Sequence, residues 1–112
     1  MPERYVLGVD IGGTSIKLAI VSSSGEIASS LRYPTSYGRL DALLGSIYDN
    51  ADGLLSRWHG PSISAIGIGI KSLTDYRCQL VSFSSLICGE ADIVLTSPLS
   101  HRFGVPAVID ND

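Results

Sequence analysis

The first third of the chain alternates between short apolar segments and turns rich in Gly and Ser. Arg4–Val9 is almost continuously apolar, which is typical of a buried strand, and Ser15–Val21 places Ile or Leu at every second position. Glu26–Tyr33 has a weaker strand pattern. Because only residues 10–14 and 22–25 separate these segments, the three strands are predicted to form an antiparallel meander.

The spacing of the apolar positions then lengthens from two residues to three or four. Between Leu40 and Trp58 these positions form one stripe, which predicts an amphipathic helix of about five turns. Gly60 and Pro61 end this helix. Ile63–Ile70 is the next apolar segment, and it indicates a further strand. A helix that joins two strands predicts a crossover connection between parallel strands.

A short second helix is predicted near the end of the chain. Residues 72–92 show little pattern apart from a weak strand signal at Gln79–Phe83. Ser97 then suits an N-cap, Pro98 suits the first helical position, and Gly104 follows the predicted end of the helix.

Val105–Ile109 is the last predicted strand, and the polar residues 110–112 follow it. The element order βββαβαβ describes a meander followed by crossover units, so we expect an α/β fold with a mixed five-stranded sheet. A buried strand normally leads into a helix that covers the sheet. No such helix follows in this sequence, and we therefore expect the chain to be part of a longer protein.

The composition excludes several classes of protein. With 112 residues, the chain has room for one small domain or part of a larger one. Its 45% hydrophobic and 17% charged residues exclude a disordered tail and a charged coiled coil. The formal net charge is −3 and the sequence has no basic cluster, so neither nucleic acid nor an anionic membrane is expected as a partner.

The sequence also favours one cellular compartment. No apolar run reaches the roughly 18–20 residues that a membrane-spanning helix needs, and the N-terminus lacks the features of a signal peptide. Cys78 and Cys88 have neither CxxC spacing nor a neighbouring His, which favours two free thiols over a disulfide or a metal site. We therefore expect a cytoplasmic protein.

The turn after the first strand is the first candidate site. Asp10 precedes Gly12, Gly13 and Thr14. Backbone N–H groups freed by glycine can bind phosphate oxygens, and a neighbouring carboxylate suits a hydrated Mg²⁺ ion. The alternative is an ordinary hairpin turn in which Asp10 bonds nearby amides. Lys17 is either a further phosphate ligand or a solvated lysine on the polar face of its strand.

The end of the last strand is the second candidate site. Asn111 and Asp112 lie where a parallel strand would end, which is the edge at which α/β sheets bind ligands. An Asp there can accept a proton from a substrate hydroxyl, and the alternative is an ordinary Asn-Asp turn. Gly67–Ser72 imitates a dinucleotide-binding fingerprint but has Ser at the third glycine position, so a Rossmann site is not expected.

Four segments together resemble a known family. Val6–Lys17 closely resembles the first phosphate motif of the ROK family (repressors, open reading frames, kinases), which belongs to the actin-like, ribonuclease H-like ATPases. Ser24–Ile27, Ala65–Ile70 and Phe103–Asp112 resemble later motifs of the family in the same order. The resemblance implies that residues 1–112 are the N-terminal lobe of a sugar kinase, with an actin-like fold. Such an enzyme transfers the γ-phosphate of ATP to a hydroxyl of a hexose or N-acetylhexosamine.

The resemblance also implies a role for each residue of the first site. Gly12, Gly13 and Thr14 would line the phosphates of ATP, and Lys17 would lie close to them. Asp10 would hold water around Mg²⁺. These roles agree with the needs of phosphoryl transfer, which depends mainly on positioning and on neutralising the charge of the phosphates.

At the second site, Asp112 would be the general base and Asn111 would hydrogen-bond the sugar. Where the family usually has a Pro-Gly pair, this chain has Lys71 and Ser72, which leaves open a sugar-sensing regulator or a non-catalytic sugar-binding protein. The second lobe of the family is absent from this chain. We therefore expect the chain alone to be inactive and, with its sheet uncovered, to form a homo-oligomer.

Overall fold

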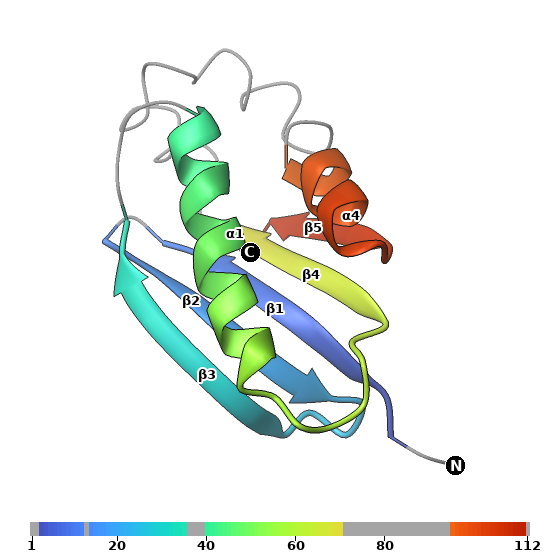
Figure 1. Ribbon diagram of the computed structural model, residues 1–112. Coiled ribbons are helices and arrows are strands. Elements are labelled where there is room, and N and C mark those ends of the chain that lie inside the picture. Colours follow the sequence, from blue (N-terminus) through green and yellow to red (C-terminus); the bar gives the residue numbers. More distant parts are fainter. Residues whose placement is uncertain (1–2, 13, 36–39, 71–94, 112) are drawn as a thin grey trace.

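The computed structural model describes residues 3–12, 14–35, 40–70 and 95–111 (Figure 1). The elements of these residues are, in chain order, β1 (Tyr5–Ile11), β2 (Ser15–Ser22), β3 (Ile27–Pro34), α1 (Leu40–Ser56), β4 (Ala65–Ile70), α4 (Ser97–Phe103) and β5 (Ala107–Asn111). This is the βββαβαβ order that the sequence predicts.

The described strands form one mixed sheet with the order β3-β2-β1-β4-β5. β2 pairs antiparallel with both β1 and β3, whereas β4 pairs parallel with both β1 and β5. The meander and the crossover connections are therefore both present. The predicted α/β class and mixed five-stranded sheet are confirmed.

One hydrophobic core fills the space between the two helices and one face of the sheet. Figure 1 shows α1 and α4 in front of this face. Side chains alternate along each strand, so every second residue of β1, β2 and β4 is buried in one core with the apolar stripe of α1. Burial of each large side chain contributes about 1.5–3 kcal/mol. The largest fully buried ones are Leu7, Ile11, Ile16, Leu18, Ile20, Leu43, Ile47, Leu54, Ile66 and Ile68.

The opposite face of the sheet is covered by neither of the two described helices. Its middle is made of small residues, because Gly8 on β1 is paired with Ala19 on β2 and with Gly67 on β4. The exposed large hydrophobic side chains among the described residues are Ile27 and Val108, on the two outer strands. This open face therefore allows close approach to the backbone of the central strands.

Several elements end at residues other than those predicted; β2 and β3 each end one residue later, at Ser22 and Pro34. β1 continues to Ile11 because it pairs with a neighbouring strand on each side, so Asp10 lies in a strand and not in the turn. α1 ends at Ser56, and Trp58 therefore lies beyond the helix. The ring of Trp58 packs on Tyr5 instead, with 5.0 Å between the ring centroids.

The start of α4 also differs from the prediction. Ser97 is not the N-cap; Thr96 holds that position in a helical conformation, and no side chain caps the helix. An N-cap hydroxyl reaches the backbone N–H groups from an extended conformation, which Thr96 does not adopt. Pro98 in the first turn and Gly104 at the C-cap, with φ 69°, are confirmed. The weak strand signal at Gln79–Phe83 lies outside the described residues.

The two parallel strands β4 and β5 begin two residues later than predicted, at Ala65 and Ala107. β5 also continues through residue 110 to Asn111, so most of the terminal polar segment belongs to the sheet. Within the part of the chain that the structure describes, neither helix has the length and apolar character needed to cross a membrane.

Candidate functional site

The carboxyl ends of β1, β4 and β5 lie at one edge of the sheet because these strands are parallel. The register pairs Asp10 with Gly69 and Gly69 with Asp110, so these residues form a row across the three strands. Neighbouring strands lie about 4.8 Å apart, which places the backbones of Asp10 and Asp110 about 10 Å from each other. Asn111 is the next residue of β5. The two polar strand ends, far apart in the sequence, thus reach the same edge.

Asp10 is exposed and is paired with Lys17 on β2. Both residues line a shallow hollow of about 300 Å³ on the open face, whose floor includes Gly8, Gly67 and Gly69. No hydrogen bond or ion pair joins the Asp10 carboxylate to any other described residue. The carboxylate is therefore available to a ligand, and Lys17 supplies a positive charge in the same row.

The turn between β1 and β2 is closed by a backbone hydrogen bond. The N–H of Gly12 donates to the carbonyl oxygen of Ser15 at 3.0 Å. A Cβ on Gly12 would lie only 2.9 Å from that oxygen, so this position requires glycine for lack of space. Thr14 is exposed beside this bond, and Gly13 lies outside the described residues. The N–H of Gly12 therefore closes the turn through its hydrogen bond to Ser15.

Thr35, which follows β3, contacts this turn through two hydrogen bonds. Its Oγ1 donates to the carbonyl oxygen of Gly12 at 2.9 Å, and its N–H donates to the carbonyl oxygen of Thr14 at 3.0 Å. The sequence interpretation missed this residue. A Thr after a Pro at the end of a weak strand carries no signal that points to a turn more than twenty residues earlier in the sequence.

The sequence-predicted site residues are thus partly brought together. Asp10 and Lys17 share a row, Thr14 lies in the adjacent turn, and Asn111 ends β5 at the same edge. The predicted base Asp112 lies outside the described residues.

The donor set at this edge fits a hydrated Mg²⁺ ion. Mg²⁺ favours one or two carboxylates, with water and phosphate oxygens completing its six ligands. Asp10 offers one exposed carboxylate next to the β1–β2 turn, and the described residues contain no group of three His, Cys, Asp or Glu side chains. These residues fit an ion held through water and not one enclosed by protein ligands.

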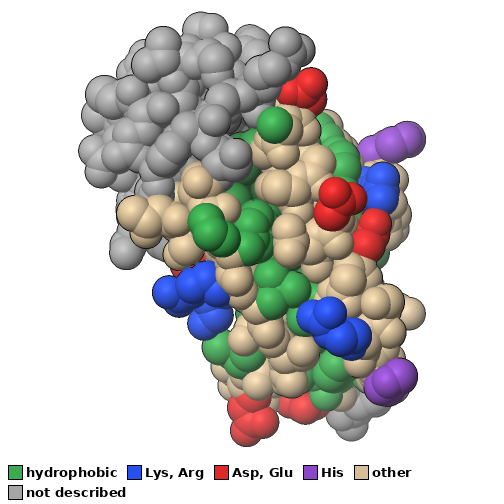
Figure 2. All heavy atoms as spheres, turned by 60° about the vertical axis from the view of Figure 1, so that its left-hand side comes forward, with side chains coloured by type: hydrophobic (Ala, Val, Ile, Leu, Met, Phe, Trp, Pro, Cys, Tyr) green, Lys and Arg blue, Asp and Glu red, His purple; other side chains and the backbone are tan. Residues whose placement is uncertain are grey.

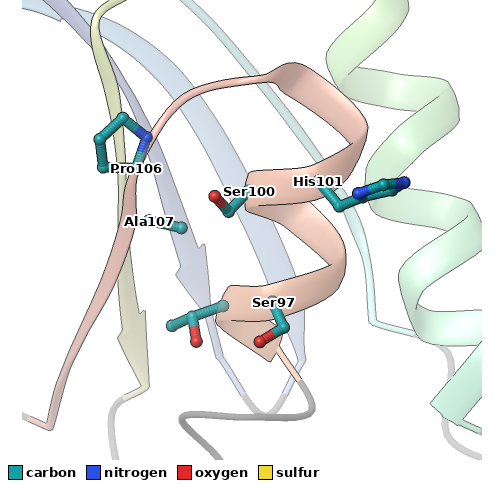
Figure 3. A pocket seen from close by; sticks show the side chains of 6 residues that line it. Ser97, Ser100, His101, Pro106 and Ala107 are labelled. Atoms are coloured by element: carbon teal, nitrogen blue, oxygen red, sulfur yellow. The ribbon is translucent and has the colours of Figure 1, made fainter.

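A second hollow, of about 440 Å³, lies between α4 and β5. In Figure 3 the hydroxyl of Ser100 points toward Ala107 and Pro106, whereas His101 points away toward α1. The described residues that line this hollow carry hydroxyl, imidazole and apolar side chains.

The charged side chains do not form a basic surface on the face shown in Figure 2. Lys and Arg side chains (blue) stand at separate places there, with Asp and Glu side chains (red) among them. The described part of this face therefore carries mixed charge.

The described residues have the fold of an actin-like ATPase lobe, because solved ROK family kinases share this arrangement. The chain belongs to the ROK family, whose family model matches residues 6–112. Both the family and the fold class that the sequence predicted are therefore confirmed.

The similar proteins are mostly sugar kinases. A glucokinase from Halalkalibacterium halodurans is 32% identical over 114 residues, covering 100% of this chain and 34% of the relative. A solved ROK family glucokinase from Streptomyces griseus, in complex with glucose and AMPPNP, has 27% identity and a TM-score of 0.69, covering 96% of this chain and 33% of that chain.

A ROK family transcriptional regulator, a homologue of the E. coli MLC protein, shares the fold with a TM-score of 0.67 at 15% identity. That likeness covers 96% of this chain and 28% of the regulator. The chain spans about a third of the length of the curated relatives that it matches.

Proposed function

We propose that this chain is the N-terminal lobe of an ATP-dependent sugar kinase that phosphorylates a hydroxyl of a hexose or N-acetylhexosamine. One observation carries the proposal: the sheet register brings Asp10, the β1–β2 turn and Asn111 to the same edge. Membership of the ROK family and the glucokinase relatives support the choice of reaction.

Each residue at this edge has a separate role in phosphoryl transfer. The β1–β2 turn, with Gly12, Gly13 and Thr14, lines the phosphates of ATP, and Lys17 adds a positive charge. Asp10 holds water around Mg²⁺, which neutralises phosphate charge when bound. These tasks suit the exposed carboxylate of Asp10, which lies beside a tight turn and forms no hydrogen bond or ion pair with another described residue.

The sugar is bound at the end of β5. Asn111 hydrogen-bonds a sugar hydroxyl, and Asp112 accepts the proton of the hydroxyl that attacks the γ-phosphate. General base catalysis of this kind contributes roughly 10²–10⁴ in rate. Because the site then lies in a cleft with its second wall on another lobe, the 112-residue chain alone is inactive.

The remaining proposals concern the whole protein. It acts in the cytoplasm, where ATP and free sugars meet. The spacing of Cys78 and Cys88, which lie outside the described residues, favours free thiols and so agrees with a reducing compartment. It forms a homo-oligomer, for which the exposed Ile27 and Val108 on the open face give apolar contact area. Neither nucleic acid nor a membrane is a partner, in keeping with the net charge of −3.

The decisive experiment uses the complete reading frame that encodes this chain. ATP-dependent phosphorylation is measured with a panel of hexoses and N-acetylhexosamines, for the wild type and for Asp112→Asn. The variant should lose at least about 10²-fold in kcat, equivalent to roughly 3 kcal/mol of barrier. Asp49→Asn, an exposed acidic residue on α1, is the matched control and should keep normal activity. Near-normal turnover of Asp112→Asn would remove Asp112 from this role.

A sugar-sensing regulator is the second candidate, favoured by Lys71 and Ser72 in place of the family's Pro-Gly pair. The same panel separates the two functions. A sensor binds a sugar in calorimetry but forms no sugar phosphate with ATP, whereas a kinase does both.

A further inference from the structure

Thr35 is the one residue after β3 whose backbone and side chain both contact the β1–β2 turn in the described part of the chain. Its hydroxyl donates to the Gly12 carbonyl and its N–H donates to the Thr14 carbonyl, at 2.9 and 3.0 Å. We propose that Thr35 is a positioning residue that holds this turn in the shape that binds the phosphates of ATP. The proposal rests on the kinase function proposed above.

The two hydrogen bonds control which groups of the turn face a ligand. Carbonyl oxygens carry partial negative charge and repel phosphate, whereas backbone N–H groups attract it. Thr35 draws the carbonyls of Gly12 and Thr14 toward β3. In a planar trans peptide the carbonyl and the following N–H point in opposite directions, so the N–H of Ser15 points away from Thr35. The Thr14 carbonyl, which faces Thr35, and the Ser15 N–H therefore point to opposite sides of the turn.

The strand that precedes Thr35 is anchored to α1 and to β2. Tyr33, two residues earlier on β3, is half-buried and hydrogen-bonds Ser46 of α1 at 3.3 Å. Its Cα partner on β2 is Ile16, whose side chain is fully buried in the core. A binding loop keeps its geometry only when the residues that support it are fixed by packing and hydrogen bonds. The end of β3 meets this condition.

Variants of Thr35 can separate the contribution of its hydroxyl group from that of its branched shape. Thr35→Val keeps the branched shape and the backbone N–H but removes the hydroxyl, leaving the partly buried Gly12 carbonyl without this donor. Thr35→Ser keeps the hydroxyl. Ser56→Ala is the matched control, because it removes a hydroxyl-to-carbonyl bond of 2.8 Å at the far end of α1.

The test uses the complete reading frame and the non-hydrolysable analogue AMPPNP with Mg²⁺. Loss of one hydrogen bond to a buried partner corresponds to roughly a tenfold change in affinity. Thr35→Val should therefore bind AMPPNP about tenfold more weakly and raise the KM for ATP to the same extent, while the KM for the sugar stays unchanged. Thr35→Ser and Ser56→Ala should stay within about twofold of the wild type.

Hydrogen–deuterium exchange of the peptide Asp10–Ile16 provides a readout that needs no ligand. Exchange should be faster in Thr35→Val than in the wild type, and Thr35→Ser should restore it. If the wild type binds AMPPNP but Thr35→Val shows unchanged exchange or unchanged AMPPNP affinity, the positioning role of Thr35 is wrong. The kinase proposal would not be affected by that result. Failure of the wild type to bind AMPPNP would overturn the kinase proposal and, with it, the phosphate role assigned to the turn.

Discussion

Asp10 and Lys17 are cross-strand partners on β1 and β2, and both line the hollow on the open face of the sheet. Directly opposite residues of an antiparallel pair have Cβ atoms about 4.5–5.5 Å apart. Opposite charges at this spacing often form an ion pair, yet no such pair joins these two described side chains. The sheet thus brings a carboxylate and an ammonium group together while leaving the carboxylate accessible.

The first prediction tests this carboxylate. Replacing Asp10 by Asn in the complete protein removes the charge that would hold the water shell of Mg²⁺. We expect kcat/KM for ATP to fall by about 10²-fold, and the Mg²⁺ concentration for half-maximal activity to rise. Steady-state kinetics over a Mg²⁺ series measures both quantities. An Asp10→Asn enzyme with the Mg²⁺ dependence of the wild type would exclude Asp10 from the metal site.

The second prediction concerns the space at Gly12. In Gly12→Ala the new Cβ would lie 2.9 Å from the Ser15 carbonyl, so the turn must shift and the free energy of unfolding should fall by about 1–3 kcal/mol. Gly45→Ala on α1 is the control, because a Cβ there meets nothing within 4 Å and alanine favours a helix by about 0.5–1 kcal/mol. Urea unfolding compares the two. Equal effects of both substitutions would contradict the crowding at Gly12.

The third prediction concerns the packing of Trp58, the single tryptophan of the chain. Its ring lies over Gly60, and its Nε1 donates to the Pro61 carbonyl at 2.7 Å. A Cβ at position 60 would overlap the ring, so Gly60→Ala should displace Trp58 from Tyr5 into water. We expect the fluorescence emission to shift to longer wavelength. The exposed Ser62→Ala should leave the spectrum unchanged.

The fourth prediction concerns the contact between α1 and α4. Arg102 donates from Nη2 to Oδ2 of Asp52 at 2.7 Å, and its guanidinium carbon lies 4.9 Å from the ring centroid of Tyr48. Both charged side chains are about half exposed, so a double-mutant cycle with Arg102→Met and Asp52→Asn should give a coupling of only about 0.2–1 kcal/mol. The coupling should shrink in 1 M salt. A salt-independent value would mean that charge contributes nothing.

The fifth prediction concerns stability at high pH. Burial raises the pKa of Tyr33 above its usual value of 10.0, an effect larger than the opposing one of the hydrogen bond with Ser46. The folded state therefore keeps this proton while the unfolded chain loses it. The resulting stability is fully present below about pH 10 and is lost as the pH rises through the folded-state pKa.

Urea unfolding between pH 8 and 11 checks this sign. Tyr33→Phe should lose less stability than the wild type over that interval, because it has no phenol to ionise. Ser46→Ala keeps the buried phenol and should retain the loss. A Tyr33→Phe protein with the same pH dependence as the wild type would show that Tyr33 does not contribute.

Local patterns in the sequence were sufficient for the elements, their order and the family. The alternation in Ser15–Val21, the stripe from Leu40 to Trp58 and the Gly60-Pro61 stop depend on neighbours a few residues apart, because strand and helix periods are local properties. The candidate residues at the ends of β1 and β5 were likewise read from motifs.

Only the tertiary structure decided which residues meet. The register that pairs Asp10 with Lys17 and Gly69, and the hydrogen bonds from Thr35 to Gly12 and Thr14, join segments that no local pattern connects. Strand pairing and core packing determine these partners. The reason is that the backbone N–H and C=O groups of the whole sheet must all find hydrogen-bond partners at the same time. The sequence therefore determined the elements and the residue types at their ends, and the sheet decided their arrangement.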